Sequence, residues 1–123
     1  NTQFDFIDEK IITQDFLVKG GVDNNYEINK DKKLKKVAFA YSNFTRMGVT
    51  YFSDQPGSQF YTGNNMVDTY QGKYNKKYGL HHGFCFEPQL PPNAINEEKF
   101  KSPILKANEK YDSTIIMLLG NNY

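Results

Sequence analysis

Short apolar stretches separated by turn residues recur along most of the chain, and none of them shows a convincing helical period. Aromatic and β-branched residues, which favour the pleated surface of a sheet, gather in several of these stretches. Gly, Pro or Asn residues bound them, as is usual at strand ends. We therefore predict five strands, at residues 37–41, 49–52, 59–62, 82–89 and 114–119. Short strands between turn signals are typical of an all-β fold, and specifically of an antiparallel β-sandwich.

The segments between the predicted strands carry residues that favour turns and loops. Residues 23–25 (DNN) follow a break at the glycines 20–21 and are typical of a turn or a polar loop. Residues 29–36 form a Lys-rich run, which is typical of a solvated hairpin loop. Residues 55–57 (QPG) have Pro and Gly in an order that suits a turn. Residues 66–78 are polar without a helical stripe, and they predict a long loop of the kind that is functional or mobile.

Composition and charge narrow the classes of partner. The 123 residues suffice for one domain or for part of a larger one. A formal net charge of +1 and a single Arg do not favour binding to nucleic acid or to a membrane surface. No apolar run approaches the roughly 20 residues that span a bilayer. We therefore expect a partner that is neither nucleic acid nor a membrane.

The one cysteine and the first residue each add an expectation. Cys85 excludes an intrachain disulfide, which favours a reducing, cytoplasmic setting. We expect Cys85 to be a small buried apolar residue rather than a nucleophile. The chain begins with Asn1 instead of Met, which suggests a processed or truncated chain.

The predicted strand at residues 82–89 has the most suggestive pattern of side chains. Alternation places Phe84 and Phe86 on one face, and Cys85 and Glu87 with other small or polar residues on the opposite face. Small residues beside a carboxylate leave room for a ligand. Pro88 favours an extended conformation at Glu87 and interrupts the ladder, as happens at an edge or bulge. The pattern alone fits a solvated edge residue as well as a catalytic carboxylate.

Several motifs in one order point to a family. Residues 59–64 (QFYTGN), preceded by 55–57 (QPG), match PG-x-Q-x-YTGN, and residues 81–89 (HHGFCFEPQ) match H-x-GFC-hydrophobic-E-x-Q. Further matches are GYDHN(Y/F), PDA-(V/I)-N and F-x-SP-x-L-x-x-GE-x-Y, at residues 22–26, 92–96 and 100–111. These are signatures of the aldose 1-epimerase (mutarotase) family, which the chain resembles from about residue 20 to 119.

The resemblance implies a fold and an activity. Residues 1–123 are then the C-terminal portion of one large antiparallel β-sandwich domain, the mutarotase-like supersandwich, whose upstream portion is absent. The implied reaction interconverts the α and β anomers of an aldohexose, glucose or galactose, by ring opening and reclosure. Glu87 takes the position of the family's general base, and Asp23 and Gln59 take positions that bind sugar hydroxyls. The resemblance implies no metal and no organic cofactor.

Departures from the family pattern leave the activity of this chain open. The family's general acid is a His upstream of this region, so we expect the chain alone to be inactive and to need the upstream portion of the same protein. His81 occupies a recurring His position, but that position is not the general acid. Val22, Asn24 and Asn93 replace the usual Tyr, His and Asp.

Two alternatives to an epimerase remain. The first is a carbohydrate-binding or structural domain without catalysis. The second is a glycoside-cleaving site that uses Asp23 and Glu87 as paired carboxylates about 5–10 Å apart. Few cationic residues lie near the motifs, which favours a free sugar over a phosphorylated one.

Overall fold

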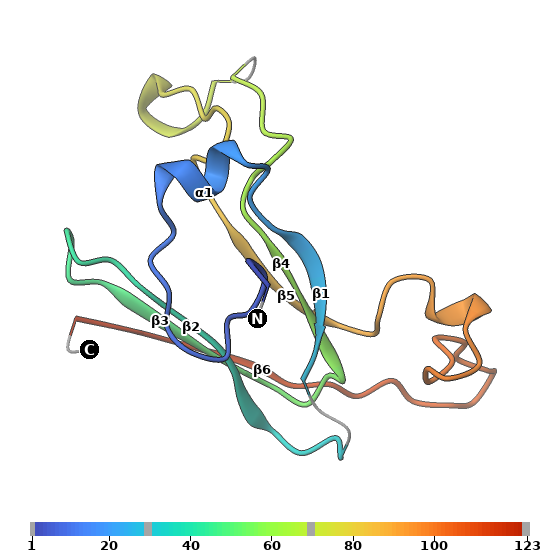
Figure 1. The fold of residues 1–123 in the computed structure, drawn as a ribbon. Helices are drawn as coiled ribbons and strands as arrows, with labels where there is room; N and C mark the ends of the chain where they lie inside the picture. The colour runs from blue at the N-terminus through green and yellow to red at the C-terminus, as the bar shows by residue number, and fades with distance from the viewer. Residues whose placement is uncertain (1, 29–30, 69–70, 122–123) are drawn as a thin grey trace. The chain divides into compact units, whose positions relative to one another are not determined.

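A computed structural model describes residues 2–28, 31–68 and 71–121 of the chain (Figure 1). The helical elements are the five-residue helix α1 and two 3₁₀ turns: α1 Gln14–Val18, η1 Lys73–Asn75 and η2 Ala94–Asn96. The strands are β1 Asp23–Glu27, β2 Lys35–Tyr41, β3 Gly48–Ser53, β4 Gly57–Tyr61, β5 Cys85–Gln89 and β6 Ile115–Gly120. Within the described residues, no helix has the length and apolarity required to cross a membrane.

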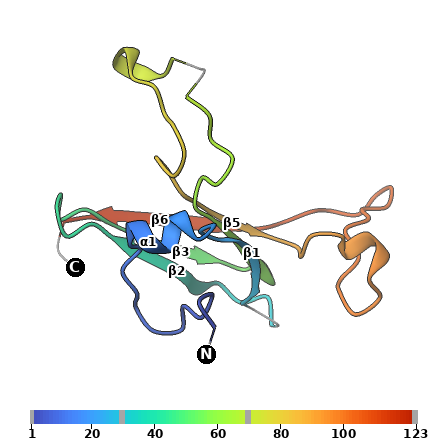
Figure 2. The same ribbon diagram turned by 45° about the horizontal axis from the view of Figure 1, so that its top comes forward.

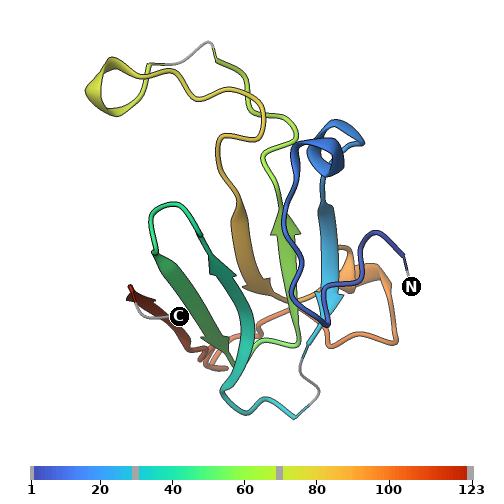
Figure 3. The same ribbon diagram turned by 60° about the vertical axis from the view of Figure 1, so that its left-hand side comes forward.

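The strands form two antiparallel sheets of three strands each. One has the order β1-β4-β5 and the other the order β2-β3-β6. The β2–β3 hairpin is visible in Figure 3, and β6 runs beside β3 in Figure 2 with an unbroken register from Gly48↔Gly120 to Ser53↔Ile115. The structure thus confirms the predicted all-β fold with the sheets of a β-sandwich. All five predicted strands are present to within a few residues.

Two predictions about the connections and one predicted strand boundary are wrong. Residues 23–25 are not a turn, because they open β1, whose backbone pairs with β4. The Lys-rich residues 29–36 are not a hairpin loop: Lys35 and Lys36 belong to β2, and the run leads from one sheet to the other. Its residues 29–30 lie outside the described residues. The strand predicted from His82 begins only at Cys85, because the chain turns at residues 80–82.

The chain separates into two compact units. The first contains residues 1–24 and 60–85, and the second contains residues 25–59 and 86–123. β1, β4 and β5 each begin in one unit and end in the other.

Aromatic contacts hold the N-terminal segment of the first unit. Phe6 lies edge-on to Phe16 and to Phe60, with ring centroids 6.0 and 5.3 Å apart. Phe60 in turn lies edge-on to Phe84 at 6.5 Å. Each such pair contributes about 0.5–1.5 kcal/mol beyond the burial of its surface. Phe60 is the buried centre of this cluster.

Val22, Thr62 and Asn64 form a closed ring of hydrogen bonds in the first unit, which we call the clasp. The Val22 N–H donates to Thr62 Oγ1 across 2.8 Å, and the Thr62 N–H donates to the Val22 carbonyl oxygen across 3.0 Å. The single Thr62 hydroxyl proton has its shorter contact, 2.7 Å, with Asn64 Oδ1. Asn64 Nδ2 completes the ring by donating to the Val22 carbonyl oxygen across 3.1 Å. Because Val22 and Thr62 are buried, the clasp satisfies backbone groups that water does not reach.

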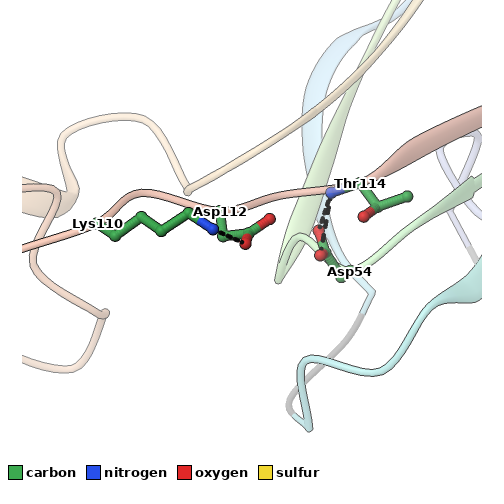
Figure 4. A network of polar contacts seen from close by, with 4 residues as sticks. All are labelled: Asp54, Lys110, Asp112 and Thr114. Atoms are coloured by element: carbon green, nitrogen blue, oxygen red, sulfur yellow. Dashed lines mark hydrogen bonds and ion pairs between the residues drawn. The ribbon is translucent and has the colours of Figure 1, made fainter.

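A second polar network, in the second unit, holds the segment before β6 against the turn between β3 and β4 (Figure 4). The Asp54 carboxylate accepts from the Thr114 N–H across 3.0 and 3.1 Å and from the Ser113 hydroxyl across 2.8 Å. The buried Gln55 amide donates to the Tyr111 hydroxyl and to Ser113 Oγ across 2.9 and 2.6 Å. These bonds determine where β6 begins along β3.

β6 is an edge strand whose apolar side chains are exposed. Its side chains alternate between the two faces of the sheet, and the exposed fractions are 53% for Ile115, 38% for Ile116, 53% for Met117, 51% for Leu118 and 68% for Leu119. A run of apolar residues is typical of a strand that is covered on both faces.

The hydrogen bonds at Asp54 predict a pH dependence of stability. Desolvation by burial raises the pKa of Asp54, but the bonds from the Thr114 N–H and the Ser113 hydroxyl outweigh it and leave the pKa below its ordinary 3.8. The stabilisation is therefore present above pH 3.8 and is lost as the pH falls through the lower folded-state pKa.

We expect Asp54→Asn to flatten the fall in the free energy of unfolding on acidification below about pH 4, measured by urea unfolding at a series of pH values. Ser113→Ala removes one of the two donors and should flatten the curve in part. Parallel curves for the wild-type and Asp54→Asn proteins would contradict the assignment.

Candidate active site

Glu87 lies in the middle of β5 with its side chain exposed. Its neighbour Phe86 points to the opposite face and contacts Tyr51 of β3 edge-on, with ring centroids 5.5 Å apart. The alternation predicted for this strand is therefore present at these two residues: the aromatic ring packs against the other sheet, and the carboxylate points away from it.

Gln59 lies on the neighbouring strand β4, in the same unit as Glu87. The contact between Phe60 and Phe84 places these two aromatic residues on one face of the sheet. Because side chains alternate along each strand, Gln59 and Glu87 both point to the opposite face. The structure therefore brings two of the three predicted site residues onto one face of adjacent strands.

Asn25 is a further candidate on this face. The Ile28 N–H donates to the Pro56 carbonyl oxygen across 2.8 Å, and the Thr62 N–H donates to the Val22 carbonyl oxygen across 3.0 Å. Both bonds give one antiparallel register between β1 and β4, and this register places Asn25 directly opposite Gln59. Opposite residues in an antiparallel pair share a face.

The Asn25 side chain has an unused hydrogen-bonding group. Its Nδ2 atom is buried and has no hydrogen-bond partner among the described residues. The side chain lies against Gly57, where an added Cβ would stand 2.9 Å from Asn25 Oδ1. Asn25 was not predicted, because the composition of residues 23–25 favours a turn; the alternation of Asp23 and Asn25 was the available signal.

Asp23, the third predicted site residue, is the first residue of β1 and is exposed. It belongs to the first unit and directly follows Val22 of the clasp. Strand alternation gives Asp23 and Asn25 the same face of β1. Asp23 is thus set at a strand end whose backbone is firmly hydrogen-bonded.

Cys85 is exposed, so the prediction of a buried apolar residue is wrong. It is the first residue of β5 and alternates onto the face of Glu87, away from the aromatic residues. The sequence marked Cys85 as small and apolar, but strand position rather than polarity determines its exposure.

The two histidines are held by backbone groups in opposite ways. His81 Nδ1 lies 2.7 Å from the Thr62 carbonyl oxygen, which can only accept, so Nδ1 carries the proton. His82 Nδ1 accepts from the Gly79 N–H across 3.1 Å, so in the neutral ring the proton is on Nε2. In both rings the described hydrogen bond is made by Nδ1.

The chemistry of the Glu87 face is that of hydrogen bonding to hydroxyl groups. A carboxylate accepts, and the amides of Gln59 and Asn25 both donate and accept. In the described parts of the chain, no three His, Cys, Asp or Glu side chains form a group that could hold a metal ion. A polar ligand with several hydroxyls suits these residues.

Two comparisons with known proteins agree with each other. A sequence model of the family described as Aldose 1-epimerase matches residues 1–118. Galactose mutarotase of Sus scrofa is 36% identical over 101 residues, which are 82% of this chain and 29% of that protein. The galactose mutarotases of Bos taurus and Homo sapiens are 37% and 36% identical over the same shares. The chain therefore spans less than a third of the length of these relatives.

We predict opposite tautomers for the two histidines in their neutral forms. At a pH of about 8, where most imidazoles are neutral, ¹⁵N spectra should show the proton on Nδ1 in His81 and on Nε2 in His82. His82→Gln should remove only the ¹⁵N signals of the ring that is protonated on Nε2, which would assign those signals to His82. The same tautomer in both rings would contradict the hydrogen bonds described above.

Proposed function

Because the chain belongs to the aldose 1-epimerase family, we propose that it is part of an enzyme that interconverts the α and β anomers of an aldohexose, glucose or galactose. The observation that carries this proposal is the placement of Glu87. It is exposed on the same face of adjacent strands as Gln59, with the packed aromatic residues on the other face.

In the proposed reaction, Glu87 removes the proton from the anomeric hydroxyl while a general acid protonates the ring oxygen. The C1–O5 bond breaks to give the free aldehyde, C1–C2 rotation follows, and reclosure gives the other anomer with acid and base exchanging roles. Asp23 and Gln59 hold sugar hydroxyls. Because the general acid of the family that the chain resembles is a His upstream of the matched motifs, we place the acid outside residues 1–123.

We also propose that the upstream portion of the same protein completes the domain. The chain covers 29% of its relatives, and β6 exposes an apolar run that suits a covered strand. The intact mass of the native protein checks this. We expect a species well above the 14.2 kDa of residues 1–123, and a native protein of 14.2 kDa would contradict it.

Polarimetry of freshly dissolved α-glucose and α-galactose with the whole native protein tests the reaction. The wild type should shorten the time to anomeric equilibrium, and Glu87→Gln should lower the enzymatic rate by about 10²–10⁴-fold, the usual contribution of a general base. The matched control is Glu98→Gln, an exposed carboxylate in the connector after η2, which should keep the wild-type rate.

Other outcomes distinguish the alternatives. Sugar binding without faster equilibration would support a binding domain. Release of free sugar from a glycoside would support paired carboxylates at Asp23 and Glu87. Full activity of Glu87→Gln would contradict the proposed base.

A further inference from the structure

His81 joins the clasp from a distant part of the chain. Its N–H donates to the Gly63 carbonyl oxygen across 3.1 Å, and its Nδ1–H donates to the Thr62 carbonyl oxygen across 2.7 Å. The Thr62 N–H and Oγ1 already bind Val22. Thr62 is therefore hydrogen-bonded to His81 through its carbonyl oxygen and to Val22 through its N–H and Oγ1.

The backbone at His81 has an unusual conformation. Its φ is 59°, in the left-handed region that is unfavourable for most residues other than Gly, Asn and Asp. At Gly21, an added Cβ would overlap Thr62 Oγ1 and would lie 3.4 Å from His81 Cε1. Gly21 itself has a φ of 57°. The absence of a side chain at Gly21 thus leaves space for the Thr62 side chain of the clasp.

We propose that His81 is a positioning residue for sugar binding, which it assists through Thr62 and Val22. Val22 is completely buried, and its N–H and C=O are both bound within the clasp. Asp23 follows it directly in the chain, so the clasp determines where the Asp23 carboxylate stands. This inference rests on the proposed role of Asp23 in binding sugar hydroxyls.

A positioning role and a merely structural role affect kinetics differently. Loss of folded protein lowers the maximal rate and leaves KM unchanged, because the remaining molecules bind sugar normally. A displaced Asp23 weakens contacts made in both the ground state and the transition state, so KM rises while kcat changes little. KM is therefore the decisive measurement.

Two variants of equal side-chain size distinguish the effect of losing the hydrogen bond to the Thr62 carbonyl oxygen from the effect of changing the backbone conformation. Asn and Asp both tolerate a positive φ, but only Asn has an N–H that can replace Nδ1–H. In the whole native protein, we expect His81→Asp to raise KM about tenfold and to keep kcat within about threefold of the wild-type value. The tenfold rise corresponds to roughly 1.4 kcal/mol, which is the size expected for the loss of one hydrogen bond. His81→Asn should keep KM within about twofold of the wild-type value.

An unchanged KM in His81→Asp, or equal increases in both variants, would overturn the proposal. Asp23→Asn serves as the test of the premise, since it should raise KM whatever His81 does. If Asp23→Asn leaves KM unchanged, the sugar-binding role of Asp23 fails. Hydrogen exchange at the Val22 amide, which donates to Thr62 Oγ1 within the clasp, then still tests the clasp. Faster exchange in His81→Asp than in His81→Asn supports a role of His81 in stabilising this strand end, and equal rates refute it.

Discussion

The need to satisfy the buried backbone of Val22 is the constraint on which the first unit depends. Val22 is fully buried, and an unpaired buried N–H or C=O would cost about 1–3 kcal/mol. Thr62 and Asn64 form hydrogen bonds with both the N–H and the C=O of Val22. The QFYTGN segment at the end of β4 therefore holds the residue that precedes β1. A short polar strand such as β1, with little apolar surface of its own, depends on this fastening.

The second unit solves a related problem at its turn between β3 and β4. Only three residues, 54–56, separate a strand of one sheet from a strand of the other. Asp54 and Gln55 direct their side chains to the segment before β6, which fixes that segment against the turn. Both units thus use short polar side chains at strand ends to determine which strands pair. The apolar residues supply the packed face, and the polar residues determine the register.

The candidate site follows from this division of roles. Tyr51 and Phe86 pack on one face, which leaves Glu87 exposed on the other, and the β1–β4 register brings Asn25 to Gln59. The motif order predicted Glu87, Gln59 and Asp23 as site residues, and the alternation of β5 predicted the face of Glu87. Alternation with Asp23 was a signal for Asn25, but its place opposite Gln59 depends on the β1–β4 register. The role of His81 could not be predicted, because it depends on a partner 19 residues away in the sequence.

The sequence by itself determined the all-β class, the places of five strands and the family, because strand composition and ordered motifs are local properties of the chain. Only the tertiary structure decided that residues 23–25 form a strand, that the Lys-rich run crosses between sheets, and that Cys85 is exposed. The physical reason is common to all three. A backbone N–H or C=O pairs with whichever group the fold brings next to it. The local residues determine neither that partner nor the face of a strand that becomes covered.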